Sequence, residues 1–262
     1  MAGISVAGIS VAGISVAGGP GPREDRAMSA VLQGGVAAVS CNDVYSFSKP
    51  NRERIVLVPG LGVLGDIHAG VTVRHRSRVA ADPSQPNLRQ VHLIQSELFG
   101  EVGAKGYEVP DGGLGENVTT VGLDLLGLPC GTVLRFGLNA PVRQTVEPGS
   151  ALDVLAAARR AVLDDEIADT VAVMGEAITA ELERSDGDAR PAVVITGLRN
   201  PCAQINRFRP GLLKEVLGRD EQGGVVRKAG VMAVVLRGGE IRPGDVVVAE
   251  VPARPHRALT KV

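Results

Sequence analysis

The sequence predicts a mainly β protein, built as an antiparallel barrel or sandwich. Short runs rich in valine and isoleucine recur along the 262 residues, and many of the 34 glycines and 16 prolines separate them. Runs of this kind are typical of strands joined by turns, and they do not alternate with helices as in βαβ units. With 44% hydrophobic but only 2% aromatic residues, the core is expected to consist mainly of Val, Leu, Ile and Ala.

Eight strands are expected, each a short β-branched run bounded by turn residues. They lie at 31–40, 53–58, 89–94, 115–120, 131–137, 192–197, 230–236 and 245–251. Residues 96–106, after the third strand, are expected to form a short helix. The sequence Arg242-Pro243-Gly244-Asp245 is typical of a tight turn, so we expect a hairpin that leads into the last strand.

A segment between the fifth and sixth strands has helical periodicity instead. Apolar residues recur on one helical face at Ile167, Val171, Met174, Ile178 and Leu182. Residues 150–162 predict a preceding helix, with Leu152 and Leu155 facing inward. We therefore expect an inserted helical hairpin within 141–190, which serves as a packing element, a lid or an oligomer contact.

The N-terminal stretch differs in composition from the rest. Residues 2–16 are three copies of Ala-Gly-Ile-Ser-Val, and residues 1–22 carry no charged side chain. The stretch lacks the basic start of a secretory signal, and Gly and Ser dilute it as a membrane span. We expect a low-complexity, disordered extension over 1–27, followed by one domain over 28–262.

The composition excludes several classes of function. The 28 Lys and Arg residues balance 29 Asp and Glu to a net charge of −1, so no global field attracts nucleic acid or an acidic membrane. The three cysteines include no CxxC pair, which argues against a disulfide framework or a structural zinc site. We expect a cytoplasmic protein that acts on a small molecule, with no nucleic-acid or membrane partner and with any anion site formed by a local basic cluster.

The densest group of candidate functional residues is 196–208, TGLRNPCAQINRF, directly after a predicted strand. Pro201 has a fixed φ and biases Asn200 toward an extended conformation. The turn that carries Cys202 is therefore expected to be stiff.

Two arginines, Arg199 and Arg207, flank Cys202. Nearby cations favour the thiolate, which is the form that binds metals or acts as a nucleophile. From these residues alone, Cys202 is either such a thiolate or a packing residue. Cys41 and Cys130 have no basic neighbours and are expected to be packing residues.

A second group is 62–79, GVLGDIHAGVTVRHRSRV. If its second half is extended, the period of two places Arg74, Arg76 and Arg78 on one face and His75 on the other. Three guanidinium groups in a row indicate either a bound anion or a solvated basic edge.

Two smaller sets of polar residues complete the candidates. Asp66 and His68 project together if their segment is extended, although two ligands alone do not make a zinc site. In 111–125, closely spaced glycines permit a tight turn or the close approach of a ligand, with Glu116 and Asn117 at the mouth of a strand.

Taken in order, these pieces resemble the MOSC domain, named after the C-terminal domain of molybdenum-cofactor sulfurase. The matching pieces are GVLGDIHAG, VRHRSRV, PNLRQVHLIQSELF, GGLGENVTTVGLDLLGLPCGTVLRFG, TGLRNPCAQINRFRPGLL and GVMAVVLRGGEIRPGD, spread over residues 31–251. The resemblance implies a barrel related to the barrel domain of pyruvate kinase, of the stand-alone bacterial type. The AGISV repeats and the helical insertion have no counterpart in the family.

The resemblance also implies a site for the molybdenum cofactor (molybdopterin), in which Cys202 is the catalytic residue and molybdenum ligand. A soft thiolate suits a metal held by a dithiolene. Further residues implied at the cofactor or its pocket are Arg74, Arg76, Arg199, Asn200, Lys228, Asp66, His68, Glu116 and Asn117.

The implied activity is the reduction of N-hydroxylated compounds with electrons from a donor protein, since the chain has no cysteine set for an iron–sulfur cluster and no dinucleotide fingerprint. Pyridoxal phosphate is associated with the family, but no lysine here argues for it and it is not expected. Two alternatives remain open. One is a non-catalytic cofactor or persulfide carrier that uses Cys202, and the other is a zinc-dependent hydrolase that uses Asp66, His68 and His92.

Overall fold

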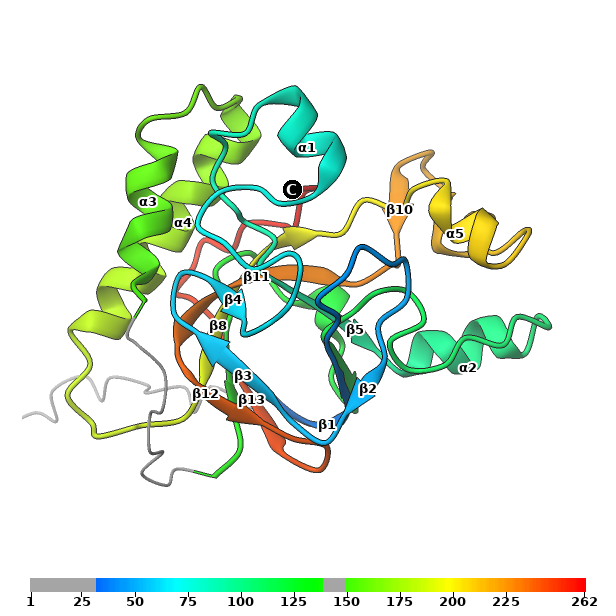
Figure 1. Ribbon diagram of the computed structural model, residues 1–262, viewed down its shortest axis with the longest axis horizontal. Helices are drawn as coiled ribbons and strands as arrows, with labels where there is room; N and C mark the ends of the chain where they lie inside the picture. Colours follow the sequence, from blue (N-terminus) through cyan, green and yellow to red (C-terminus); the bar gives the residue numbers. More distant parts are fainter. Residues whose placement is uncertain (1–31, 139–148) are drawn as a thin grey trace, which may run out of the picture. The chain divides into compact units, whose positions relative to one another are not determined.

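The computed structural model describes residues 32–138 and 149–262, and their strands form a closed seven-stranded barrel (Figure 1). The barrel strands are β1 (Leu32–Ser40), β5 (Val91–Gln95), β6 (Val118–Val121), β7 (Val133–Phe136), β8 (Ala192–Leu198), β11 (Val231–Arg237) and β13 (Val246–Glu250). The predicted mainly β barrel is therefore confirmed. The expected extension over 1–27 and the start of the insertion at 141–148 lie outside the described residues.

Neighbouring strands follow the order β13-β7-β8-β11-β5-β6-β1, and pairing of β1 with β13 closes the barrel. All barrel pairs are antiparallel except β5 and β6, which run parallel. A parallel pair needs a crossover connection, and here the crossover contains α2 (Glu97–Gly103). This helix is the short one that the sequence predicts.

Smaller elements lie around the barrel. Strand β2 (Asn51–Arg52) pairs with the end of β1. Strand β3 (Ile55–Val58) pairs with β4 (Gly62–Val63) and β12 (Gly239–Ile241), and β9 (Leu217–Arg219) pairs with β10 (Val225–Arg227). The short helices are α1 (Arg76–Ala81), η1 (Leu125–Gly127), α5 (Gln204–Phe208) and α6 (Leu213–Val216).

The predicted turn at 242–245 forms. Asp245 N donates to Arg242 O at 3.2 Å, and Gly244 has a φ of 90°. The predicted hairpin is wrong, because β12 before the turn pairs with β3, whereas β13 after it pairs with β1 and β7.

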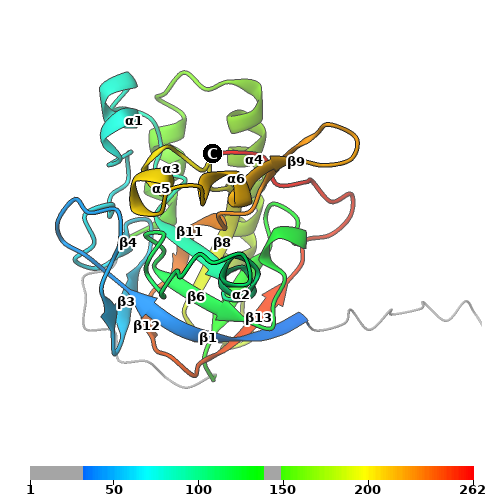
Figure 2. The same ribbon diagram turned by 90° about the vertical axis from the view of Figure 1, so that its right-hand side faces the viewer.

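Alternate residues of the central strands fill two separate cores. In β8, Val193 and Ile195 face the barrel interior, whereas Ala192 and Val194 face a second core under the helices α3 (Ala151–Ala158) and α4 (Asp165–Leu182). Figure 2 shows these two helices behind β8 and β11. Because both faces of β8 are covered, almost all of its residues are apolar and its sequence does not alternate between apolar and polar residues.

The two helices form the predicted hairpin, but part of the predicted apolar face is wrong. Met174 and Ile178 are buried as expected, whereas Leu182 is 64% exposed. Leu182 is the last residue of α4, and at this end of the helix the charged side chain of Glu181 contacts Arg135 of the barrel. In α3 the buried face runs through Val154 and small alanines, and Leu152 is 48% exposed.

A buried arginine ties α4 to the barrel. Arg135 of β7 is 1% exposed and contacts Glu181 at 2.6 Å, Glu250 at 2.8 Å and Asp188 at 3.5 Å. Such a group is stable in the interior because its charge is paired on several sides.

Candidate functional site

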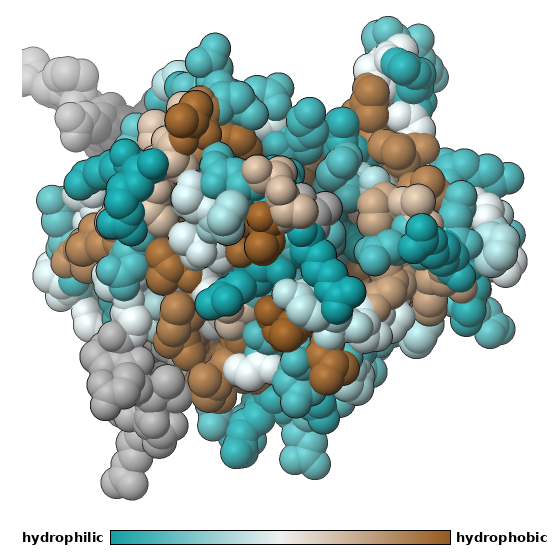
Figure 3. Space-filling model, turned by 45° about the horizontal axis from the view of Figure 1, so that its top comes forward, coloured by the Kyte–Doolittle hydropathy of each residue, from teal (hydrophilic) through white to brown (hydrophobic). Residues whose placement is uncertain are grey.

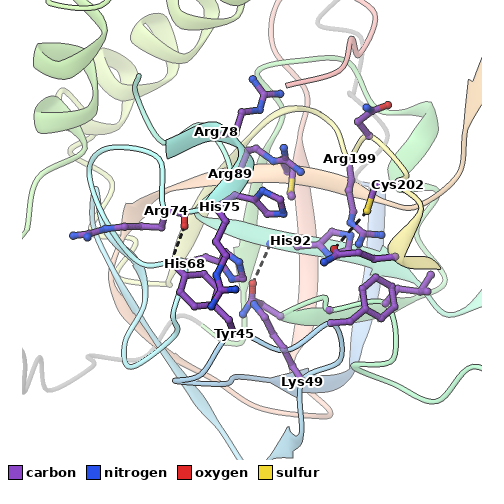
Figure 4. A pocket seen from close by; sticks show the side chains of 18 of the residues that line it. Tyr45, Lys49, His68, Arg74, His75, Arg78, Arg89, His92, Arg199 and Cys202 are labelled. Atoms are coloured by element: carbon purple, nitrogen blue, oxygen red, sulfur yellow. Dashed lines mark hydrogen bonds between the residues drawn. The ribbon is translucent and has the colours of Figure 1, made fainter. Parts of the chain in front are cut away.

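A cavity of about 350 Å³ is formed by six segments of the chain (Figure 4). The segments are the loop after β1, the residues around α1, the start of β5, the turn before β6, the turn after β8 and the start of β11. Its lining comprises Tyr45, Ser46, Phe47, Lys49, His68, Val73, Arg74, His75, Arg76, Arg78, Asn87, Arg89, His92, Leu114, Gly115, Asn117, Arg199, Asn200, Cys202, Gln204 and Met232.

The lining is strongly cationic. Six of its side chains are lysine or arginine, and no described residue of the lining is Asp or Glu: the six are Lys49, Arg74, Arg76, Arg78, Arg89 and Arg199. The chain as a whole has a net charge of −1, so this is a local basic cluster of the kind predicted. Its chemistry suits an anion that carries several oxygen acceptors.

Arg199 is, with Lys49, one of the two buried cations of this lining. It is only 9% exposed, and its Nη1 has no hydrogen-bond partner among the described residues. Burial lowers the pKa of its guanidinium group, and negative charge on Cys202 or Glu116 would counter that effect. A buried polar atom without a partner is rare in folded proteins, so this donor needs an explanation.

Arg89 lies just before β5, and the sequence analysis missed it. Burial and the neighbouring charges of Arg78 and Arg199 lower its pKa to about 10. Arg89 is the first residue of the strand predicted at 89–94, which was the one available signal; Lys228 lies just before the strand predicted at 230–236 without reaching the cavity. The cationic residues thus disfavour each other's charge and would gain from a bound anion.

Cys202 lies in the turn between β8 and α5 and lines the cavity. It is half-buried, and its Sγ lies 3.5 Å from Gln204 Oε1. The electrostatic interactions of Cys202 with Arg89 and Arg199 favour the charged forms of both arginines. Its neighbour Asn200 accepts a hydrogen bond from Arg227 Nε at 3.1 Å.

The other two cysteines have structural surroundings, as predicted. Cys130 is buried, and Cys41 is half-buried against the barrel core. Burial raises the pKa of both thiols, which keeps them protonated. Arg207, expected to flank Cys202, is exposed and does not line the cavity.

Asp66 lies behind the wall and orders three lining side chains. Its carboxylate accepts from Lys49 Nζ at 2.7 Å, Asn117 Nδ2 at 2.9 Å and His68 Nδ1 at 3.2 Å. Burial opposes ionisation, but the hydrogen bonds from His68 and Lys49 outweigh it and hold the pKa of Asp66 well below its usual range. Asp66 therefore shapes the cavity without lining it.

Besides Asp66, two further predicted site residues do not line the cavity. Glu116 is fully buried and accepts hydrogen bonds from the backbone N–H groups of Gly112 at 2.5 Å and Leu114 at 3.0 Å, so it fixes the glycine-rich turn. Burial raises its pKa. Lys228 forms an ion pair with Glu101 at 2.7 Å on the outside.

The predicted extended row of three arginines is wrong. Thr72 forms an isolated bridge with Pro86, and Val73 N donates to Gln85 O at 3.0 Å. The backbone is still extended at His75, which precedes the first turn of α1 at Arg76, so Arg76 and Arg78 lie in a helix and not on a strand face with Arg74. The arginines still reach the cavity from different directions, and the guanidinium group of Arg74 lies at the outer edge of the group in Figure 4.

Histidines and a tyrosine form the remaining wall. The rings of His68 and His75 stack at 6.1 Å, and Tyr45 meets His68 edge-on at 6.1 Å. Arg76 lies over the ring of Tyr45 at 4.3 Å, and the Tyr45 hydroxyl donates to Arg74 O at 3.0 Å.

The residues of the alternative zinc site do not converge. His92 is buried with its Nε2 at 2.7 Å from Ala229 O, and Asp66 is occupied by its ion pair with Lys49. Across residues 32–138 and 149–262, no group of three His, Cys, Asp or Glu side chains is placed to hold a metal ion. A zinc hydrolase built on Asp66, His68 and His92 therefore has no support.

The inserted helices lie away from this site. None of their described residues lines the cavity, and their buried side chains pack in the second core. No helix in the described part of the chain is long and apolar enough to cross a membrane. Hydrophilic and hydrophobic side chains are interspersed on the face shown in Figure 3, as is usual for protein surfaces.

Comparison with solved structures supports the fold. The crystal structure of the YuaD protein from Bacillus subtilis matches 85% of this chain and 98% of its own, with a TM-score of 0.56 and 18% sequence identity. YiiM from Geobacillus stearothermophilus matches 83% of this chain and 75% of its own at a TM-score of 0.45 and 14% identity, too distant to add to the argument. No family model and no curated protein matches. The chain thus has a MOSC-like fold.

Proposed function

We propose that the chain binds a molybdenum cofactor and reduces N-hydroxylated compounds with electrons from a donor protein. The observation that supports this best is the cavity itself, where the Cys202 thiol shares a wall with six cationic side chains and no carboxylate of the described lining opposes them. The cofactor carries a phosphate and a metal–dithiolene group, so it needs both features in one place.

The residues fit such a group. The unpartnered Nη1 of Arg199 is a buried donor that requires an acceptor. Arg89 has its charge disfavoured by burial and by neighbouring cations, which an anion would relieve. When bound, the cofactor would supply two-electron redox chemistry at its metal.

Each part of the wall then has a role. Cys202 would ligate the metal through Sγ, and Arg89 and Arg199 would hold the anionic part of the cofactor. Asn200 is kept in place by Arg227 and would donate through its amide. Arg76 would close the outer side of the cavity over Tyr45, and Arg78 would add positive charge beside Arg89.

The test is metal and pterin analysis of protein produced in a host that makes the cofactor. We expect molybdenum and pterin in the parent and in Cys41→Ala, and loss of molybdenum in Cys202→Ala with little change in Tm. Cys41 is the matched control because it is also half-buried but lies outside the cavity lining. A Cys202→Ala protein that keeps molybdenum would contradict the proposal.

The carrier alternative predicts a different result. Cys202 is half-buried and can reach a partner, so a carrier would show a sulfur-sized mass increase on Cys202 that reductant removes. If the protein carries such an adduct but does not reduce an N-hydroxylated substrate, the proposed reductase function would be wrong and a persulfide-carrier function would take its place.

A further inference from the structure

Asp66 and His68 form a carboxylate–imidazole pair at the cavity wall. Asp66 Oδ1 lies 3.2 Å from His68 Nδ1 and also accepts the backbone N–H of His68 at 2.9 Å. The carboxylate is ionised and acts as an acceptor, so the proton of the neutral ring lies on Nδ1. Nε2 is then the ring nitrogen available to a molecule in the cavity.

The other groups that face His68 leave this pair intact. His75 stacks on it and stays neutral, because burial and the charge of Arg89 lower the pKa of His75 to about 4. The rings of Tyr45 and His68 meet at 86°, and Arg76 lies over the ring of Tyr45. Lys49 faces Asp66 at 2.7 Å and balances part of its charge.

His68 is also placed to exchange protons with water. Its side chain is 25% exposed, whereas the Asp66 side chain is 1% exposed. An imidazole that is held by a buried carboxylate and open on its other nitrogen has the geometry of a general acid–base group.

We propose that His68 is the proton donor of the cavity and Asp66 its positioning residue. This inference rests on the proposed function. In a substrate R–NH–OH the N–O bond breaks, and two electrons from the donor protein reduce the nitrogen. The Nε2 proton of cationic His68 passes to the leaving hydroxyl oxygen to give water, and a proton from solvent completes R–NH₂. Solvent then returns a proton to Nε2.

The activity test uses cofactor-loaded parent, His68→Gln, Asp66→Asn and, as a control, His256→Gln. His256 is exposed and lies outside the cavity lining. Hydroxylamine serves as the substrate probe and reduced methyl viologen as the electron donor, and molybdenum content is measured for every protein.

We expect His68→Gln to lower kcat by about 100-fold or more, in line with the loss of a general acid. The pH profile of kcat should also differ between this variant and the parent. Asp66→Asn should lower kcat less, and His256→Gln should match the parent. Equal kcat and pH profiles for parent and His68→Gln would overturn the inference and leave the proposed function standing, whereas loss of molybdenum from His68→Gln would reassign His68 to cofactor binding.

A second measurement needs no cofactor. Nitrogen-15 NMR of the four histidines, assigned through His→Gln variants, should show neutral His68 with its proton on Nδ1 in the parent. Asp66→Asn should shift the tautomer toward Nε2–H. An Nε2–H tautomer in the parent would overturn the pairing whatever the activity result, and a parent without molybdenum or turnover would remove the proposed function and this inference together.

Discussion

Replacing Arg199 by methionine should weaken anion binding while leaving the free protein as stable as before, or more stable. Methionine has a similar length but needs no hydrogen-bond partner. In the free protein the Arg199 guanidinium is buried and its Nη1 has no partner among the described residues, so removing it removes a desolvation cost.

The size of the binding effect follows from the bond that is lost. A hydrogen bond to a charged group contributes about 1.5–3 kcal/mol, which corresponds to a Kd about 10- to 150-fold weaker. Inorganic pyrophosphate is a suitable probe, with Kd measured by isothermal titration calorimetry at fixed ionic strength and unfolding followed in urea.

The matched control is Arg207→Met, because Arg207 is exposed and outside the cavity. It should change neither quantity by much. An unchanged pyrophosphate Kd in Arg199→Met, or a loss of more than about 2 kcal/mol in its free energy of unfolding, would refute the reasoning, since a loss of that size is typical of a structural residue.

Three further predictions concern the supporting structure. Arg135→Met should lower the free energy of unfolding by about 1–3 kcal/mol, because Glu181 and Glu250 lose one partner while Glu181 keeps Arg237 and Glu250 keeps Arg184; urea unfolding checks this, and a loss under about 1 kcal/mol would contradict it. Asp66→Asn should be less stable than the parent at pH 7, and the difference in their free energies of unfolding should shrink as pH falls below about 4. The pKa of Asp66 is lower in the folded protein than in the unfolded chain, so its carboxylate stabilises the fold above the unfolded pKa, and this stabilisation is lost as pH falls toward the folded pKa. Unfolding at pH 7, 4 and 3 tests the sign, and a constant difference would disprove it. Iodoacetamide should label Cys202 before Cys41, with Cys130 labelled only after unfolding, since burial raises the pKa of the latter two thiols; peptide mass spectrometry gives the order, and early labelling of Cys130 would show that its burial is wrong.

The strands could be predicted because their apolar runs are buried on one or both faces whatever the topology. The order of the strands could not, since the β1–β13 closure and the parallel β5–β6 pair depend on contacts between distant segments. The sequence pattern also gave a wrong prediction at Arg76–Ala81, where the chain forms a helix directly after the extended His75, although the alternation of arginines fits a strand.

The part of the site that lies within a single turn of the chain was predictable from the sequence. Cys202, Arg199 and Asn200 share one turn and line the cavity together. Arg89 and Lys49 were missed because only folding brings them there, and Glu116 was misplaced because a buried carboxylate that holds a turn has the same sequence appearance as one that faces a ligand.

The placement of Tyr45 has a practical consequence for spectroscopy. The chain has no tryptophan and two tyrosines, of which Tyr107 packs against the helices α2, α5 and α6. Tyr45 lies in the cavity wall under Arg76, so a molecule that displaces this arginine should change tyrosine emission. The protein therefore carries a built-in optical reporter of occupancy, and titrations can be followed without a dye or an introduced label.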